Sequence, residues 1–167
     1  DYTKTSLCKL LDAGVNITMV QIGNETTSGL SGETEWDKMT SLMSAGSKAV
    51  RETAEQYNRE ILVAMHFTEY EHYDWYASKL QQFEVDYDVF ASSYYSYWHG
   101  DLAGLEKSLQ NIIDKYQKKV LIVEFAYPYN LANTDNHPNA VSWGGSLNFP
   151  YTVNKDGQTQ AICDIYK

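Results

Sequence analysis

Apolar residues recur along this chain in two patterns, one typical of amphipathic helices and one typical of buried strands. Spacings of three and four residues, as in Leu7, Leu10 and Leu11, alternate with short continuous apolar runs. The first pattern predicts helices over 2–13, about 36–57, about 71–83 and 102–116, with a last helix starting near residue 156. The second pattern predicts strands over 18–23, 61–65, 88–95 and 120–124.

Strands and helices alternate four times in this prediction, which favours an α/β fold with a parallel sheet. Uninterrupted apolar strands are typical of sheets that are covered on both faces. With 167 residues, the chain is long enough for one domain but short for a complete (β/α)8 barrel of about 250 residues. It begins at Asp1 with no initiator Met and no signal-like segment, so we expect a processed or excised form of a longer protein.

Composition narrows the possible partners. The formal net charge of −9 argues against binding to nucleic acid, and no apolar stretch approaches the ~18 residues of a membrane span. The 14 tyrosines and four tryptophans suit a cleft in which rings stack on sugars, although about half of the tyrosines would serve the core. Cys8 and Cys163, in two separate predicted helices, are expected to be buried thiols.

Two predicted strands lead into glutamates. Strand 18–23 leads into Asn24 and Glu25, and strand 120–124 ends at Glu124. The C-terminal ends of barrel strands meet on one face, so the two carboxyls would converge there. Two carboxyls about 5–5.5 Å apart suit a retaining glycosidase, and about 6.5–9.5 Å an inverting one. By pattern alone, however, either glutamate could be a surface group or a helix cap.

Further polar and aromatic residues lie near the strand ends. An amide such as Asn24 can bind a sugar hydroxyl, or it can merely end its strand in a turn. A tyrosine of the 94–95 pair could donate to Glu124, or it could be part of an aromatic core. The full set of candidate substrate-binding residues is Asn24, His66, Tyr94, Tyr95, Trp98 and His99. A lone histidine at a strand end, such as His66, is however more often a hydrogen-bonded structural residue than a catalytic one.

The loop over 126–154 is long enough that we expect it to be functional. Four ligand-capable residues alternate within it, namely Asn133, Asp135, His137 and Asn139. Their mainly oxygen donors favour a structural Ca2+ ion, although the same spacing is also compatible with an ordinary polar loop. The sequence contains neither a glycine-rich phosphate loop nor a nucleophile elbow, so nucleotide binding and Ser-His-Asp catalysis are not indicated.

At these residues the chain resembles the endo-β-1,4-galactanases of glycoside hydrolase family 53, which are retaining (β/α)8 enzymes. The resemblance rests on three stretches: 20–25, 93–100, and Val123-Glu124 with the aromatic-rich loop after it. It implies that Glu25 is the acid/base, Glu124 the nucleophile and Asn24 a contact of the sugar 2-hydroxyl. A tyrosine of the 94–95 pair would support the nucleophile, and Trp98 and His99 would line the groove.

The resemblance also implies limits. Ser96 and Tyr97 replace the Pro and Phe of the family pattern, and Asn133 replaces an Asp of the calcium loop, which should weaken that site. The chain 1–167 would be a partial catalytic domain covering roughly strands 4 to 7, without strands 1–3 and strand 8. Four strands would leave two open edges, so the rest of its own barrel is an expected partner.

The sequence therefore predicts a retaining endo-glycosidase that hydrolyses β-1,4-galactan, a side chain of pectin, and needs no cofactor for its chemistry. Alternatives are a mannanase or cellulase of the same clan, a non-catalytic carbohydrate-binding barrel fragment, and a calcium-dependent binding domain. Because the substrate is a polymer, we expect the protein to act extracellularly or in the periplasm.

Overall fold

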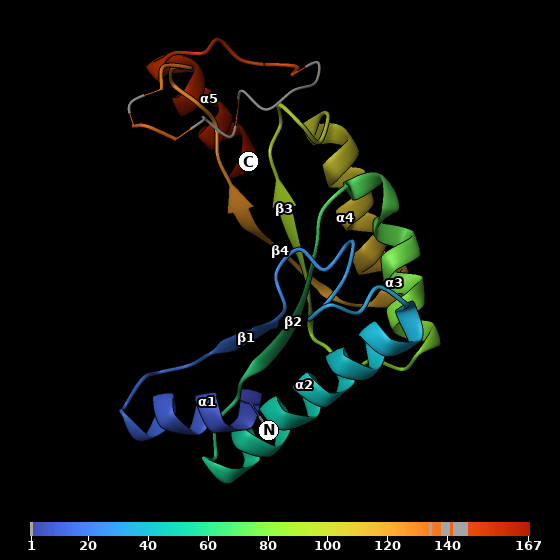
Figure 1. Ribbon diagram of the computed structural model, residues 1–167. Helices are drawn as coiled ribbons and strands as arrows, with labels where there is room; N and C mark the ends of the chain where they lie inside the picture. Colours follow the sequence, from blue (N-terminus) through green and yellow to red (C-terminus); the bar gives the residue numbers. More distant parts are fainter. Residues whose placement is uncertain (1, 134, 138–140, 142–146) are drawn as a thin grey trace.

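The computed structural model describes residues 2–133, 135–137, 141 and 147–167 (Figure 1). In chain order the elements are α1 (Tyr2–Asp12), β1 (Met19–Ile22), α2 (Trp36–Gln56), β2 (Leu62–Phe67), the 3-10 helix η1 (Tyr70–His72), α3 (Tyr73–Gln82), β3 (Val89–Tyr94), α4 (Leu102–Tyr116), β4 (Lys119–Phe125) and α5 (Lys155–Ile165). Every predicted helix and strand is present, with bounds within two residues of the prediction. Within the part of the chain that the structure describes, none of the helices has the length and apolar character of a membrane span.

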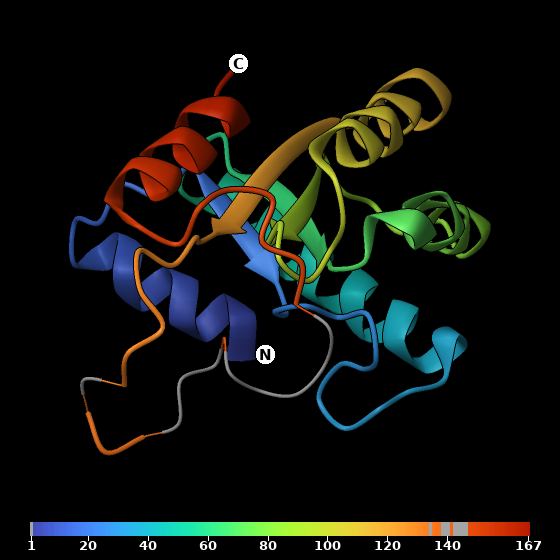
Figure 2. The same ribbon diagram turned by 90° about the horizontal axis from the view of Figure 1, so that it is seen from above.

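The four strands form one parallel sheet in the order β1-β2-β3-β4. Helices α2, α3 and α4 lie in an arc along one face of it, as Figure 2 shows from above. Each strand therefore follows its sequence neighbour in space, as in a segment of a (β/α)8 barrel. The C-terminal ends of all four strands meet at one edge, and the loops after them carry the candidate site.

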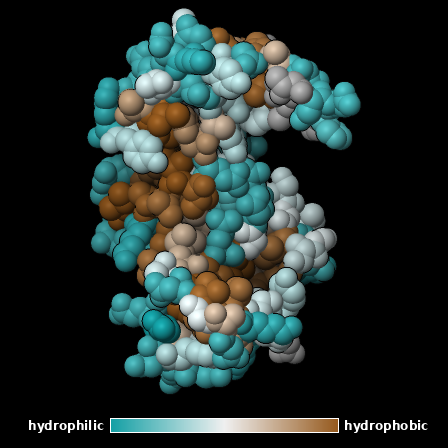
Figure 3. Space-filling view, turned by 90° about the vertical axis from the view of Figure 1, so that its left-hand side faces the viewer, coloured by the Kyte–Doolittle hydropathy of each residue, from teal (hydrophilic) through white to brown (hydrophobic). Residues whose placement is uncertain are grey.

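Strand side chains alternate between two faces. The outer face packs on the helices and forms the main core, which includes Val63, Met65, Phe67 and Phe90. The inner face carries a second, smaller cluster of Ala64, Val89 and Ala91, with Met19, Leu62 and Val123 packed against it. Leu121 remains 42% exposed. On the side of the molecule turned away from α3 and α4, apolar surface is visible in Figure 3.

Tyrosine serves both the core and the surface. Half of the 14 tyrosines are buried, as expected, namely Tyr73, Tyr76, Tyr87, Tyr94, Tyr97, Tyr116 and Tyr127. Burial raises the pKa of each of these phenols above its usual value, and that of Tyr76 to about 12. These phenols therefore stay protonated at neutral pH.

The prediction of two buried thiols is wrong. Cys8 is half-buried on α1 and Cys163 is exposed on α5, and both are free. On α5 the buried residues are Gly157 and Ala161, so Cys163, two positions beyond Ala161, falls on another side of the helix.

Arg51 on α2 forms ion pairs with two aspartates in the segment just before β3. Its Nε and Nη2 donate to the two carboxylate oxygens of Asp86 at 2.8 and 3.1 Å, and its Nη1 donates to Asp88 at 2.9 Å. The carboxylate of Asp88 also accepts the backbone N–H of Val63 at 2.7 Å. The hydrogen bonds from Arg51 and Val63 outweigh desolvation, so the pKa of Asp88 lies below its usual value.

We predict that Arg51→Ala lowers the free energy of unfolding by about 1–2 kcal/mol, since the pairs with Asp86 and Asp88 are only partly shielded from solvent. Because the pKa of each aspartate is depressed on folding, this stabilisation is present above about pH 4 and is lost as the pH falls further. Urea unfolding at neutral and acidic pH measures both effects. Lys48→Ala, which removes a charge at a highly exposed site on the same helix, is the control. Equal losses for the two variants would contradict the prediction.

Candidate active site

Glu25 lies in a sharp turn directly after β1. Gly23 has a φ of 79°, and a Cβ atom there would come within 2.5 Å of Thr26, so the turn requires glycine. Glu25 itself has a φ of 45°, in the left-handed region that non-glycine residues rarely adopt. Its backbone N–H donates to Nδ1 of His66 at 3.1 Å. The turn thereby directs the half-buried side chain of Glu25 toward the inner side of the sheet.

A β-bulge positions Glu124. Ser92 pairs with Ile122 and Ser93 pairs with Glu124, which leaves Val123 as an extra residue in β4. Ile122 packs with the outer core and Val123 with the inner cluster. In an unbroken strand Glu124 would then point outward again. The bulge reverses this alternation, so that Glu124 faces the inner side and Phe125 packs on the outer core.

The two carboxylates lie close together. One carboxylate oxygen of Glu25, one of Glu124 and a ring nitrogen of His66 all lie within 4.8 Å of one another. A separation of this order is close to the spacing of about 5–5.5 Å that retaining glycosidases use. Both ring nitrogens of His66 already have hydrogen-bond partners, so the trio does not form a ready metal site.

The 94–95 pair is divided between the two faces of the sheet. Tyr95 donates its hydroxyl proton to Oε2 of Glu124 at 2.7 Å. Burial and this hydrogen bond raise the pKa of Tyr95 well above its usual range, so the phenol stays protonated. Tyr94 is buried in the outer core, where its hydroxyl donates to the carbonyl of Gly100. The predicted substrate contact of Tyr94 is therefore wrong, because Tyr94 lies on the opposite face from the glutamates.

Three other predicted substrate-binding residues lie near the two glutamates and have side chains that are at least partly exposed. Asn24 is exposed and accepts a hydrogen bond from Gln21 at 3.3 Å. Trp98 is 45% exposed, and its ring lies edge-on to the ring of Tyr95. His99 accepts the backbone N–H of Tyr95 through Nδ1, and burial lowers its pKa. His66, by contrast, is completely buried, so its predicted contact with substrate is wrong.

The predicted calcium ligands are only partly within the described residues. Asn133, Asp135 and His137 are exposed, and the carboxylate of Asp135 accepts the backbone N–H of His137 at 2.9 Å. Asn139 lies outside the described residues. One carboxylate in a local turn does not define a cation site, so structural Ca2+ stays a prediction.

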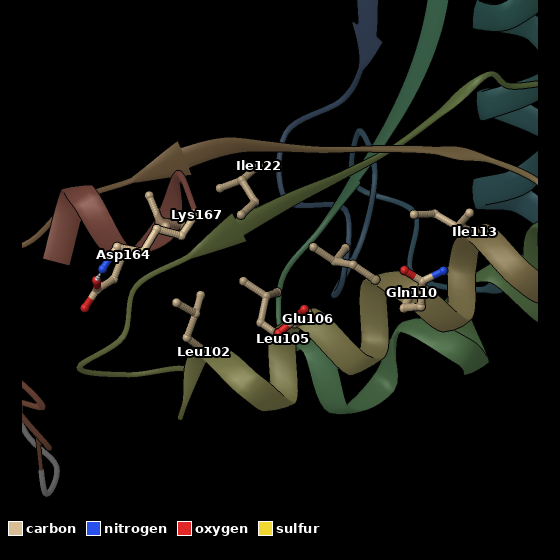
Figure 4. A pocket seen from close by; sticks show the side chains of 10 residues that line it. Leu102, Leu105, Glu106, Gln110, Ile113, Ile122, Asp164 and Lys167 are labelled. Carbon is tan, nitrogen blue, oxygen red and sulfur yellow. Dashed lines mark hydrogen bonds and ion pairs between the residues drawn. The ribbon is translucent and has the colours of Figure 1, made fainter.

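A groove of about 500 Å³ lies elsewhere, between α4, β4 and α5 (Figure 4). Its walls are mainly apolar, with Leu102, Leu105, Ile113 and Ile122 among them. Ile122 points to the outer side of the sheet and Glu124 to the inner side, so the groove is separate from the two glutamates.

Ser93 was missed by the sequence analysis. Its Oγ lies 2.8 Å from Nε2 of His66, and both side chains are buried. The available signal was the strict alternation within the third predicted strand, which puts Ser93 on the same face as Ala91 and Tyr95.

Comparisons with known proteins agree with this geometry. A parallel α/β sheet that brings two glutamates together at its C-terminal edge has the arrangement of a barrel glycosidase. The sequence model described as Glycosyl hydrolase family 53 matches residues 1–167. The chain therefore belongs to glycosyl hydrolase family 53, as the sequence analysis predicted.

Individual relatives show how much of the fold is present. The chain is 46% identical to an endo-beta-1,4-galactanase of Bacillus subtilis (strain 168), over 99% of this chain and 38% of that protein. It is 30% identical to an arabinogalactan endo-beta-1,4-galactanase of Humicola insolens, over 99% of this chain and 51% of that protein. The solved structure of the Ignisphaera aggregans GH53 catalytic domain matches with a TM-score of 0.83 and 27% identity, over 98% of this chain and 46% of that domain. The chain thus spans about half or less of these relatives, as a partial barrel.

Ser96 provides a test of the site's packing. Among the side-chain atoms described, its buried Oγ has no hydrogen-bond partner. A buried hydroxyl without a partner costs free energy, so we predict that Ser96→Ala raises the free energy of unfolding by about 1 kcal/mol. Ser92 is also buried, but its hydroxyl bonds that of Tyr73. Ser92→Ala should therefore lower stability, and thermal or urea unfolding compares the two. A loss of stability for Ser96→Ala would contradict the prediction.

Proposed function

We propose that this chain carries the two catalytic glutamates of a retaining endo-glycosidase that cleaves β-1,4-galactan. The observation that carries the proposal is the approach of Glu25 and Glu124 to within 4.8 Å, with Tyr95 hydrogen-bonded to Glu124. A carboxylate that already accepts a hydrogen bond from a neutral phenol is held in one orientation, as a nucleophile must be.

In this mechanism Glu124 attacks the anomeric carbon while Glu25 protonates the leaving glycosidic oxygen. The covalent glycosyl-enzyme forms on Glu124, and Glu25, now ionised, takes a proton from the attacking water. Tyr95 bonds Oε2 of Glu124, which leaves Oε1 as the attacking oxygen. This contact supports the assignment of Glu124 as the nucleophile, because Tyr95 fixes the side chain without taking its charge.

The substrate is proposed from the relatives, two of which are described as galactanases. The exposed surfaces of Trp98 and Asn24 beside the glutamates are the groups that would meet sugar rings and hydroxyls. A complete cleft would also need strands beyond the four described here, so we propose the remainder of a barrel as the structural partner. A polymeric substrate favours action outside the cytoplasm.

The proposal is tested by measuring reducing ends released from galactan, mannan, xylan and cellulose. The assay uses this chain alone and a chimera in which it replaces the aligned segment of the Bacillus subtilis relative. We expect cleavage of galactan, reduced more than about 100-fold by Glu124→Ala. Glu106→Ala, an exposed glutamate on α4, is the control.

Each failure has its own meaning. Cleavage of mannan or cellulose instead of galactan would support the other enzymes of the clan. Binding to galactan without new reducing ends, in the chimera as well, would support a non-catalytic module. A smaller loss than about 100-fold in Glu124→Ala would remove the nucleophile assignment.

The two roles are separated by adding azide to each variant with an aryl β-galactoside as substrate, which loses its aryl group as the aryloxide, and by determining the anomeric configuration of the galactosyl azide that forms. In Glu124→Ala, azide fills the space of the nucleophile and attacks from that face, so the product is the α-galactosyl azide. In Glu25→Ala, the enzyme intermediate forms first and azide attacks from the other face, which gives the β-product. The opposite pair of products would reverse the roles of the two glutamates.

We predict that Tyr95→Phe lowers kcat about 10- to 100-fold with little change in KM, because a hydrogen bond to a charged group contributes about 1.5–3 kcal/mol. Steady-state kinetics on galactan measures this effect. Tyr94→Phe removes the same atom from the neighbouring residue on the other face and should leave kcat unchanged. Equal effects of both substitutions would contradict the support of Glu124 by Tyr95.

A further inference from the structure

His66 makes contacts with the turn of the acid/base glutamate that the proposed function does not yet use. It lies on β2, a strand that carries neither glutamate, and its side chain is completely buried. Nδ1 of its ring accepts the backbone N–H of Glu25 at 3.1 Å. Its carbonyl oxygen accepts both the N–H and the hydroxyl of Thr26, at 2.8 and 2.9 Å. One buried residue thus binds two successive residues of the turn.

These contacts fix the protonation of the ring. Since Nδ1 accepts a hydrogen bond, it carries the lone pair, and Nε2 must then carry the proton and donate it to Ser93 at 2.8 Å. A doubly protonated ring would direct a second N–H at the N–H of Glu25 and push the turn away. Burial lowers the pKa of His66, against the opposing effect of the carboxylates of Glu124 and Glu25, which favours the neutral ring.

The turn needs this support because Glu25 is in the left-handed region, which costs about 1–2 kcal/mol for a residue with a side chain. Such a conformation persists only where its surroundings over-determine it. If Glu25 relaxed to a negative φ, its Cβ would leave the present direction and the carboxylate would move away from Glu124.

We infer that His66 is a positioning residue, whose neutral ring, held by Ser93, keeps the backbone of Glu25 in the conformation that aims its carboxylate at Glu124. The inference rests on the proposed function for its catalytic consequence, since Glu25 is the acid/base only in that proposal. His66 itself touches no substrate, because it is completely buried.

Three substitutions separate positioning from packing. In His66→Asn the amide oxygen takes the place of Nδ1 and can still accept from Glu25, whereas His66→Leu fills space without an acceptor. Ser93→Ala leaves the ring in place but removes the partner of Nε2. We expect kcat to fall more than tenfold in His66→Leu with KM within threefold, and His66→Asn to recover most of the loss. The kcat of Ser93→Ala should lie between the values for His66→Leu and His66→Asn.

The deciding experiment is NMR on the full chain with 15N-labelled histidine, together with hydrogen exchange of the Glu25 amide. At about pH 6, where an ordinary imidazole is mostly protonated, we expect the ring of His66 to be neutral with its proton on Nε2. The Glu25 amide should be protected in the wild type and in His66→Asn and exchange at least tenfold faster in His66→Leu. A charged ring, a proton on Nδ1, or equal protection in all three proteins would overturn the inference.

These readouts need no polysaccharide, so they distinguish the two proposals. Suppose that the wild type shows the neutral ring and the protected amide, but neither the wild type nor the chimera cleaves a polysaccharide. The galactanase proposal then fails, and the positioning of the Glu25 backbone by His66 stands. If galactan is cleaved and His66→Leu retains full kcat, the proposed function stands and the positioning role fails. If His66→Leu fails to fold, the protonation state of His66 can still be measured in the wild type. A charged ring or a proton on Nδ1 would then still overturn the inference.

Discussion

The site depends on the parallel pairing of four consecutive strands, because parallel pairing brings every C-terminal strand end to the same edge. Glu25 follows β1, His66 lies near the end of β2, Tyr95 follows β3, and Glu124 lies near the end of β4. No two of these four residues are closer than 29 positions in the chain. Hydrogen bonds nevertheless join them pairwise across the edge, from Glu25 to His66 and from Tyr95 to Glu124. A change in strand order would separate the groups.

Parallel pairing is not sufficient, however, because each side chain must also face the inner side. His66, Ser93 and Tyr95 do so by ordinary alternation along β2 and β3. Glu124 does so only because the bulge at Val123 inserts one residue into β4. The same insertion turns Phe125 outward, where its ring stacks near that of Tyr94. The outer core therefore stabilises the orientation of the carboxylate on the other face.

The polar groups around the glutamates share one electrostatic property, which is that they are neutral donors or acceptors. The pKa of Tyr95 is raised and those of His66 and His99 are lowered, in each case mainly by burial. Neutral partners orient a carboxylate without cancelling its charge, as the proposed mechanism requires of Glu124. The same buried groups also stabilise the backbone of Glu25. Its positive φ costs free energy, and the hydrogen bonds of His66 with Glu25 and Ser93 offset that cost.

The sequence by itself determined the helices, the strands and the two glutamates, because these follow from local periodicity and from the residue that ends each strand. It could not decide which of Tyr94 and Tyr95 meets Glu124, or that His66 binds the backbone of Glu25 and not a substrate. It also placed Cys8 and Cys163 in the interior, which the structure does not. These points depend on register, on the bulge and on which helix face is covered. Such features arise from contacts between residues far apart in the chain, and only the tertiary structure sets them.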